Sequence, residues 1–354
     1  MEILLEHFYN NEIHADKFHH RKVYLDDDSY QITGVTQSGK SKLIKNYLLG
    51  LKKNTYLYID CSDIRINISE FNNKLQNFCT VNKITTLVLD NFFPAIELVN
   101  VDQIIISSEL DYDVAELKKI KLYPLDYEEF LAYEHKYDST ALNHFFQLGG
   151  FAAMQKLHND ERIPFIQKSL QYTLEEMEFE ILILCAKMMS QKLSPFSIYE
   201  RLKQTRKVSK DKLYKSYQSL HAKGYIHELQ KLHHSKATKK VYLCDTSIRL
   251  ALTSDRHFGR RFENMLYLEL LKSRRECFYD DGIDFYTPQS DEIILGMPFT
   301  DERTLFKKIE SMEAFIFTHQ IQKITAVTMS REAKLNHPLS EVEMIPFDIW
   351  ALGD

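Results

Sequence analysis

Residues 30–50 read YQITGVTQSGKSKLIKNYLLG, and this stretch decides the expected fold of the chain. It matches the pattern G-x-x-x-x-G-K-[ST] in full, with four residues at the fixed positions: Gly34, Gly39, Lys40 and Ser41. The preceding Tyr30–Thr33 is typical of a short buried strand, and the following Lys42–Leu49 of a helix that Gly50 ends. A strand, a glycine-containing loop and a helix in this order predict a phosphate-binding loop.

The chemistry of such a loop predicts a nucleotide site. Backbone N–H groups and the helix N-terminus attract phosphate, while Lys40 would neutralise the β- and γ-phosphates and the Ser41 hydroxyl would coordinate Mg²⁺. We therefore expect ATP and Mg²⁺ as cofactors, although the pattern serves GTP equally well. The expected nucleotide-binding residues are Gly34, Val35, Thr36, Gln37, Ser38, Gly39, Lys40, Ser41, Lys42 and Ser107. The alternative is an ordinary strand–helix turn without a ligand.

A second acidic strand end is expected beside the loop. Ile84–Asp90 (ITTLVLD) has the composition of a buried strand and ends in Asp90, which with Ser41 forms the predicted metal site. The alternative is an aspartate that merely ends a strand. Many ATPases of this type carry Glu at the next position, but here Asn91 can orient water without accepting its proton. Asp90 and Asn91 are the candidate catalytic residues, and Glu109 is a nearby carboxylate that could replace the missing base.

Further strands alternate with helices along the first third of the chain. Thr55–Ile59 and Val101–Ser107 have strand composition, and their alternation with helices predicts an α/β fold with a parallel sheet covered on both faces. Ser107 ends one of these strands, where a polar side chain can sense the γ-phosphate.

Composition excludes several classes of protein. The 354 residues have a net charge of −5 and are 44% hydrophobic, which excludes a disordered chain, and ten glycines are too few for collagen-like or linker architectures. The length predicts two or three domains. Five dispersed cysteines without a C-x-x-C pair predict reduced thiols and no zinc site. No signal peptide pattern is present and no apolar run approaches the ~18–20 residues of a membrane span, so we expect a cytoplasmic protein without membrane contact.

Residues 174–245 predict three helices and a β-hairpin, the pattern of a winged helix-turn-helix. The expected helices are Glu175–Met189, Ser197–Gln204 and Lys210–Lys223, and the strands are Tyr225–Leu229 and Lys240–Cys244. Lysines near the start of the third helix and in the hairpin are candidate contacts to duplex DNA, because phosphate attraction requires no base sequence. They are Lys210, Lys212, Lys215, Lys236, Lys239 and Lys240. The alternative is a solvated helix face on a module that contacts protein.

Several short features, taken in order, resemble the bacterial and archaeal AAA-type ATPases in which an NTPase core is joined to a winged helix and a nuclease-like domain. They are Gly34–Ser41, LVLD at Leu87–Asp90, IIISSE at Ile104–Glu109, YPLDYEEFL at Tyr123–Leu131, LGGF at Leu148–Phe151, VYLCD at Val241–Asp245, GRRFEN at Gly259–Asn264 and IDF at Ile283–Phe285. The resemblance implies a P-loop NTPase core over residues 1–122, a helical lid over 123–172, a winged helix over 173–246 and a small α/β restriction-endonuclease-like domain over 247–354.

The same resemblance implies a nuclease site that this chain does not complete. Glu263 and Asp284 match acids of that fold, but metal-dependent cleavage also needs a Lys two residues after a nearby Glu. Here Ile294 follows Glu292 at that spacing. We therefore expect an inactive domain with a scaffold or partner-binding role, in which Glu263 and Asp284 are structural.

Three hypotheses follow. The first is an AAA-type ATPase that uses nucleotide to position its winged helix, on duplex DNA if the basic residues serve that purpose. The second is an NTP-dependent switch or scaffold that binds protein partners, or further copies of itself, with little or no hydrolysis. The third, a metal-dependent nuclease, is disfavoured by the missing lysine.

Overall fold

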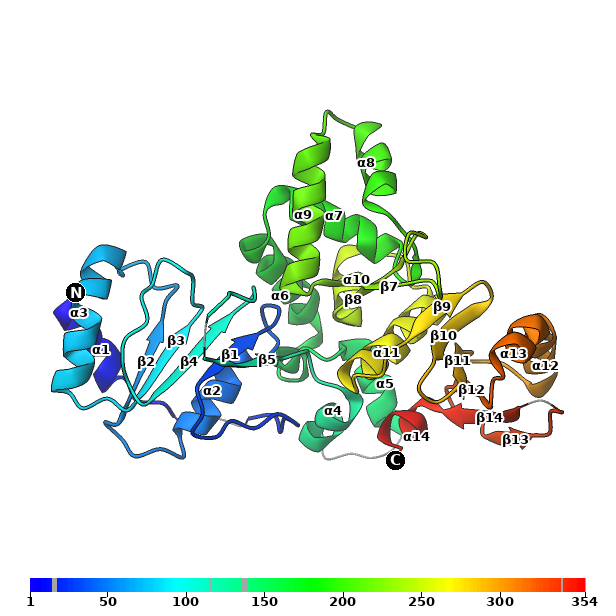
Figure 1. Ribbon diagram of the computed structural model, residues 1–354, viewed down its shortest axis with the longest axis horizontal. Coiled ribbons are helices and arrows are strands. Elements are labelled where there is room, and N and C mark those ends of the chain that lie inside the picture. The colour runs from blue at the N-terminus through cyan, green and yellow to red at the C-terminus, as the bar shows by residue number, and fades with distance from the viewer. Residues whose placement is uncertain (15–17, 115, 135–138, 339, 354) are drawn as a thin grey trace. The chain divides into compact units, whose positions relative to one another are not determined.

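The computed structural model describes residues 1–14, 18–114, 116–134, 139–338 and 340–353 (Figure 1). The chain divides into two compact units, Met1–Pro124 with Ala222–Gly224, and Leu125–His221 with Tyr225–Asp354. Among the helices of the described ranges, none has the length and apolar character needed to cross a membrane.

The first unit is built on a five-stranded parallel sheet in the order β2-β3-β4-β1-β5. Its strands are β1 (Tyr30–Thr33), β2 (Tyr56–Asp60), β3 (Thr86–Asp90), β4 (Gln103–Ser108) and β5 (Lys118–Lys121). Every residue of β3 is buried, as expected for an inner strand of a parallel sheet. The predicted parallel sheet is confirmed. The edge strand β5 was not predicted, because its sequence KKIK lacks the apolar pattern of a buried strand.

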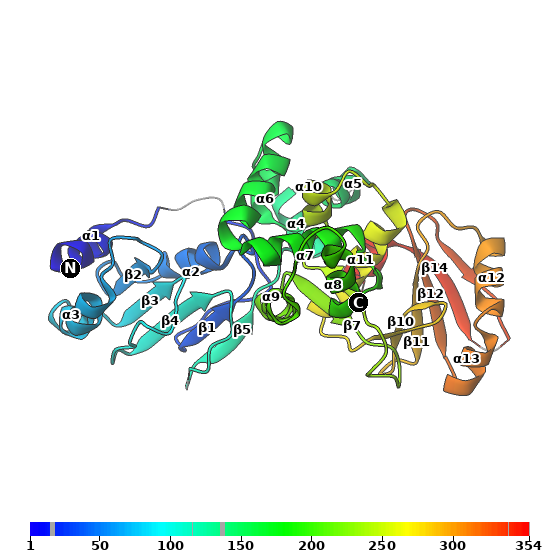
Figure 2. The ribbon, with the colours of Figure 1, turned by 90° about the horizontal axis from the view of Figure 1, so that it is seen from above.

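Helices cover both faces of this sheet, as predicted. They are α1 (Glu2–Asn10), α2 (Lys40–Leu48) and α3 (Ile68–Val81). Leu87 and Leu89 of β3 pack in one apolar cluster with α1 and α3, and Figure 2 shows these two helices next to β2. Val88 packs in a second cluster with α2. Successive residues of β3 therefore serve opposite faces, as the pleat of a strand requires.

The second unit begins with helices and a small sheet. The helices are α4 (Tyr127–Glu134), α5 (Ser139–Leu148), a 3₁₀ turn (Ala152–Gln155), α6 (Asn159–Thr173), α7 (Glu176–Lys187), α8 (Pro195–Lys203), α9 (Lys210–Lys223) and α10 (Thr246–Leu252). An antiparallel sheet in the order β6-β8-β7 joins β6 (Gln191–Lys192), β7 (Ile226–Leu229) and β8 (Lys240–Leu243). The three helices and the hairpin predicted from residues 174–245 are present, with ends that differ by no more than two residues.

The rest of this unit is a helix followed by a mixed six-stranded sheet in the order β13-β14-β12-β11-β10-β9. The elements are α11 (Phe258–Lys272), β9 (Phe278–Asp280), β10 (Ile283–Thr287), β11 (Glu292–Gly296), α12 (Glu302–Glu310), α13 (Glu313–His319), β12 (Lys323–Thr328), β13 (Ala333–Leu335), β14 (Glu341–Pro346) and α14 (Phe347–Leu352). Strands β11, β12 and β14 run parallel. Apolar residues of α12 and α13 form one core cluster with those of β11, β12 and β14.

Asp245 connects the turn after α5 to the start of α10. Its buried carboxylate accepts hydrogen bonds from the Ser247 N–H at 2.8 Å and the Gly150 N–H at 2.5 Å. A Cβ on Gly150 would lie 2.3 Å from the Leu125 carbonyl oxygen, so this close approach requires glycine. Burial raises the pKa of Asp245 despite these hydrogen bonds. Two of the short segments singled out in the sequence, LGGF and VYLCD, thus lie in contact.

This close approach predicts opposite effects for two glycine substitutions. Gly150→Ala should lower the free energy of unfolding by about 1–3 kcal/mol, because the added methyl group overlaps the Leu125 carbonyl. Gly259→Ala in α11 is the matched control, since nothing lies within 4 Å of a Cβ there, and it should raise stability by up to about 1 kcal/mol. Urea unfolding measures both. Equal effects would contradict the steric argument.

Candidate nucleotide site

The segment between β1 and α2 folds into a tight loop that depends on two glycines. The Gly34 N–H donates to the Ser108 carbonyl at 3.3 Å, and a Cβ on Gly34 would lie 2.2 Å from the Leu122 carbonyl oxygen. Gly39 has a φ of +98°, a left-handed conformation that favours glycine, and immediately precedes α2. The helix therefore begins at Lys40, two residues earlier than predicted, and its N-terminus faces the loop.

The Lys40 side chain reaches from the first residue of α2 back to the loop. Its side chain is buried, and Nζ donates to the carbonyl oxygens of Gly34 at 2.7 Å and Val35 at 3.1 Å. Burial lowers the pKa of Lys40, while the nearby carboxylates of Glu109 and Asp90 act in the opposite direction. The structure therefore places the ammonium group at the centre of the predicted phosphate-binding segment.

Ser38 carries a buried hydroxyl in the same loop. Its residue is 1% exposed, and Oγ has no hydrogen-bond partner among the residues that the structure describes. Buried polar groups in proteins are almost always hydrogen-bonded, so an orphaned hydroxyl in a loop of this shape is a feature that a bound group can satisfy.

Asp90 is held between the neighbouring strands. Its buried carboxylate accepts hydrogen bonds from the hydroxyls of Tyr58 on β2 and Ser107 on β4, and from the Asn91 N–H at 3.2 Å. Burial together with the Asp90 charge raises the pKa of Tyr58 far above the usual range. The predicted metal ligand Asp90 is thus held by hydroxyls from both neighbouring strands.

Asn91 adopts a conformation that differs from that of its strand. Its φ is +56°, and its side-chain Nδ2 donates to Asp60 Oδ1 at 2.9 Å. Asp60 ends β2 directly opposite Asp90 in the register of the sheet. The amide of Asn91 is therefore anchored to the neighbouring strand.

Three further residues contribute to the site. Tyr58 and Arg21 were not identified from the sequence, and Glu109 was considered only as a possible base. Tyr58 donates to the Asp90 carboxylate, and Arg21 donates to the carbonyl oxygens of Ser38 at 2.9 Å and Tyr123 at 2.6 Å. Glu109 accepts from the Thr36 N–H at 3.1 Å and the Thr36 hydroxyl at 2.6 Å. The sequence around Arg21 and Tyr58 contains no recognisable motif, so sequence patterns alone could not have identified these two residues.

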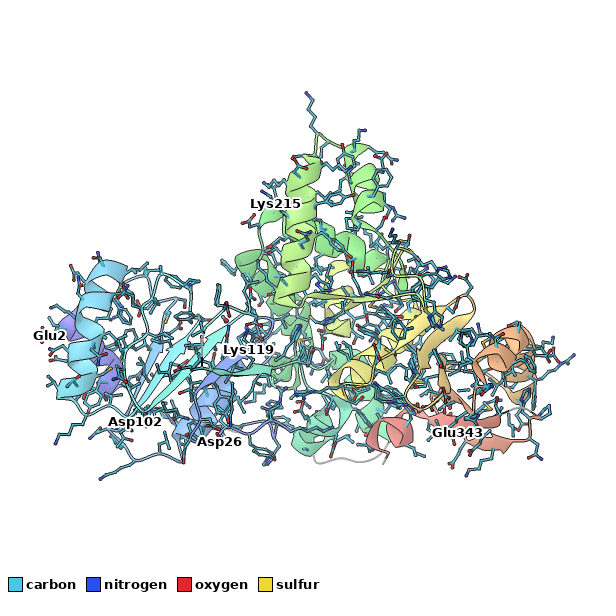
Figure 3. All side chains as sticks on the ribbon, in the orientation of Figure 1. Glu2, Asp26, Asp102, Lys119, Lys215 and Glu343 are labelled. Carbon is cyan, nitrogen blue, oxygen red and sulfur yellow. The ribbon has the colours of Figure 1, made fainter. Side chains whose placement is uncertain are left out.

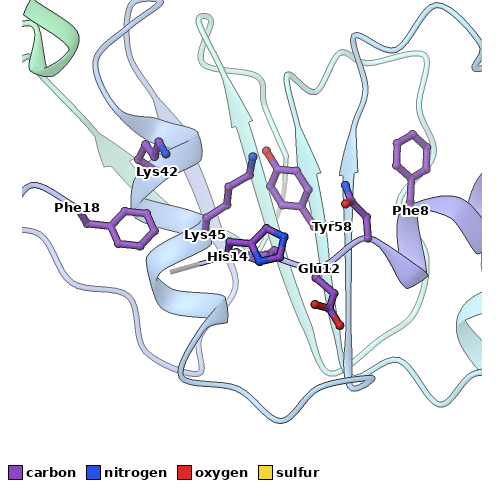
Figure 4. Close-up of a pocket in the computed structure, with 9 residues that line it drawn as sticks. Phe8, Glu12, His14, Phe18, Lys42, Lys45 and Tyr58 are labelled. Atoms are coloured by element: carbon purple, nitrogen blue, oxygen red, sulfur yellow. The ribbon is translucent and has the colours of Figure 1, made fainter. Parts of the chain in front are cut away.

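A pocket of about 310 Å³ lies beside α2 (Figure 4). It is lined by Phe8, Asn11, Glu12, Ile13, His14, Phe18, Lys42, Lys45 and Tyr58. The Lys42 ammonium lies 5.5 Å from the centre of the Phe18 ring, and the Lys45 ammonium lies 4.7 Å from that of Tyr58. Aromatic faces and positive charge therefore meet in one pocket next to the loop between β1 and α2, and its volume is in the range of small-molecule sites.

The candidate DNA-contacting lysines fall into two groups. Lys210, Lys212 and Lys215 on α9 and Lys236 in the hairpin are exposed, and Figure 3 labels Lys215 on α9. The two other hairpin lysines have carboxylate partners: Lys239 pairs with Glu228 at 2.5 Å, and Lys240 pairs with Glu263 at 2.9 Å. Lys240 is also only 13% exposed in its side chain. Lys240 is therefore partly shielded from solvent, unlike the four exposed lysines.

Lys240 also supplies a positive charge at the acids of the C-terminal part. Its ammonium lies 3.7 Å from Asp284 Oδ1, and Glu263 accepts a further hydrogen bond from Tyr242 at 2.8 Å. Burial and the Asp284 charge raise the pKa of Glu263 to about 7, against the opposing effect of Lys240. Within the described ranges, no group of three or more His, Cys, Asp and Glu side chains is arranged to hold a metal ion.

Glu292, the third acid considered in the sequence, has other partners. It pairs with Arg275 at 2.5 Å and accepts a hydrogen bond from the Thr325 hydroxyl at 2.6 Å. Asp284 instead accepts from the Gly296 N–H at 2.9 Å. The structure thus brings Glu263 and Asp284 together around Lys240.

No protein-family model matches the chain, and no curated protein matches it in sequence. Among solved structures it is similar to the Orc1 protein of Aeropyrum pernix in complex with DNA, with 14% sequence identity over 67% of this chain and 89% of that chain. The TM-score of this match is 0.32, which is too low to transfer a fold or a function.

The environment of Glu263 predicts a pH dependence of stability. Its folded pKa of about 7 lies above the ordinary value of 4.5, so the stabilisation is complete below about pH 4.5 and is lost as the pH rises through 7. Between pH 5 and 8 the free energy of unfolding should fall by up to about 3 kcal/mol from this group. Glu263→Gln should flatten that fall in urea unfolding, whereas Glu313→Gln on the exposed surface of α13 should not. A wild-type slope in the Glu263 variant would contradict the assignment.

Proposed function

We propose that the first unit is a P-loop NTPase core of AAA type that binds ATP with Mg²⁺. The observation that carries the proposal is the buried Lys40 ammonium inside a glycine-dependent loop, at the edge of a parallel sheet where Asp90 also lies. A helix N-terminus and a lysine together are suited to polyphosphate.

The residues present fit the expected ligands. The orphaned Ser38 hydroxyl and the left-handed Gly39 suit a group seated in the loop, and Lys40 would pair with its phosphates. Ser41 and Asp90 would hold Mg²⁺, which neutralises phosphate charge when bound. The pocket beside α2, with its aromatic faces and lysines, offers one side on which the rest of a nucleotide can bind.

Slow turnover is part of the proposal. Asn91 replaces the expected glutamate, and its side chain is engaged with Asp60, so it offers no proton acceptor for an attacking water. This observation favours the second candidate function as well, an NTP-dependent switch or scaffold that binds protein partners or copies of itself and hydrolyses little or no nucleotide.

We further propose that the second unit contains the lid, the winged helix and a nuclease-like domain without activity. Three helices followed by an antiparallel hairpin support the winged-helix assignment. The exposed lysines at the start of α9 support contact with duplex DNA through phosphate, with Lys236 in the hairpin as a further contact. The Lys240 ammonium at Glu263 and Asp284 supports a structural role for these acids.

Lys40→Ala tests the nucleotide site directly. Loss of the ammonium should weaken MgATP binding at least about tenfold, because a charge-assisted contact to phosphate contributes about 1.5–3 kcal/mol. Lys52→Ala, which removes an exposed lysine of the same unit, should bind like the wild type. Calorimetric titration with MgATP and MgGTP measures affinity and base preference, and an unchanged Kd for Lys40→Ala would refute the proposal.

Combined substitution of Lys210, Lys212 and Lys215 by Ala tests the DNA contact. If these lysines meet phosphate, affinity for duplex DNA should fall, and the slope of log K against log salt should decrease by about one for each phosphate that is no longer neutralised. Fluorescence anisotropy at several salt concentrations measures both quantities.

A matched triple substitution provides the control. Lys307, Lys308 and Lys334 lie on the C-terminal part of the chain, and their replacement by Ala changes the net charge equally. This variant should retain the wild-type slope. Equal losses of affinity in both variants would show that overall charge, and not the α9 face, governs DNA binding, and no DNA binding by the wild type would favour the protein-partner alternative.

A further inference from the structure

Glu109 makes an unexpected contact with the phosphate loop. Its Oε1 accepts two hydrogen bonds from one loop residue, from the Thr36 N–H at 3.1 Å and the Thr36 hydroxyl at 2.6 Å. The backbone N–H groups of such a loop are the groups that bind phosphate oxygens, and a carboxylate oxygen is an anionic acceptor of the same kind. The loop thus already holds an anion that belongs to the chain itself.

The topology of the sheet explains why this carboxylate can reach the loop. Strands β1 and β4 run parallel, with Thr33 opposite Ser108, and the next residues of the two strands are Gly34 and Glu109. The Gly34 N–H also donates to the Ser108 carbonyl, which fixes the spacing between the two segments. Glu109 is therefore tethered one residue beyond a strand end that adjoins the loop, and its effective concentration there is high.

The position of Lys40 agrees with an internally occupied loop. Its ammonium donates to the carbonyl oxygens of Gly34 and Val35, and the Glu109 carboxylate is close enough to act on it electrostatically. Thr36 and Glu109 are both only partly buried, so a ligand can approach them from solvent.

We infer that Glu109 is a built-in competitor of the nucleotide, which occupies the Thr36 N–H and hydroxyl until a phosphate group displaces it. The inference rests on the proposed nucleotide site and adds a role for a residue outside the loop motif. Displacement exchanges two hydrogen bonds from Thr36 to a carboxylate for contacts of the same groups with phosphate, so it lowers the apparent affinity of the site. It also links occupation of the loop to the segment that follows β4.

The test compares MgADP and MgATP binding to the wild type, Glu109→Gln and Glu109→Ala. Gln keeps the size of the side chain but removes its charge, and Ala removes the competing group altogether. Both variants should bind nucleotide about tenfold more tightly, the factor that corresponds to loss of one charge-assisted hydrogen bond. Glu97→Gln, an exposed glutamate of the same unit, changes the net charge equally and should leave affinity within twofold of the wild type.

Two further measurements separate displacement from the simpler effects of charge. The gain should persist in 0.5 M NaCl, where charges acting at a distance are screened within about 4 Å. Hydrogen exchange of residues 34–41 without nucleotide should be faster in Glu109→Ala than in the wild type, because Thr36 loses its acceptor.

The outcomes distinguish this inference from the proposed function on which it rests. Tighter binding in both Glu109 variants supports displacement, and binding by the variants alone supports it most strongly. Equal affinity in all proteins would overturn the inference but would leave the proposed nucleotide site unaffected. If the Glu109 variants kept their affinity but lost turnover, Glu109 would instead be a proton acceptor, and the inference would again be overturned. A gain that vanishes in high salt would also overturn it. Binding by none of the proteins would overturn both proposals.

Discussion

The parallel alignment of β1, β3 and β4 is the constraint on which the candidate nucleotide site depends. Parallel strands bring their carboxyl ends to one edge of the sheet, and here the pairing sets Ile32 opposite Ser107 and Leu89 opposite Ile106. The loop, the acidic strand end and the polar end of β4 therefore arrive together without any long-range signal in the sequence. Buried apolar side chains on both faces hold the strands in this register.

The alignment buries the Asp90 carboxylate, and the neighbouring strands compensate for its lost hydration. A carboxylate buried at a strand end needs hydrogen-bond donors, and two neutral hydroxyls from the adjoining strands supply them. Neutral donors satisfy the oxygen lone pairs without adding a compensating positive charge. The Lys40 ammonium, on which Asp90 acts electrostatically, donates to loop carbonyls instead. The site thus gathers polar groups of both kinds at one edge of the sheet.

Some features of the first unit could be predicted from its sequence and others could not. The parallel sheet followed from strands that alternate with helices, and its acidic strand end followed from Ile84–Asp90, because parallel strands bring their carboxyl ends to one edge. Strand β5 was not predicted, because an edge strand pairs through its backbone and tolerates a polar sequence. The roles of Tyr58 and Arg21 were not predicted for a different reason. Their side chains contact residues of neighbouring segments, and the spacing of residues in the sequence does not show such contacts.

Lys240 illustrates the same limit in the second unit. Sequence spacing showed that Ile294 stands where a lysine would be needed, and it assigned Lys240 to a basic hairpin facing solvent. In the fold, β8 carries this lysine to the partly buried carboxylates of Glu263 and Asp284. Two acids close together in a low-dielectric setting repel each other, so an ammonium from any neighbouring element stabilises them. The positive charge beside Glu263 and Asp284 thus comes from a strand of another part of the chain, and not from the position two residues after Glu292.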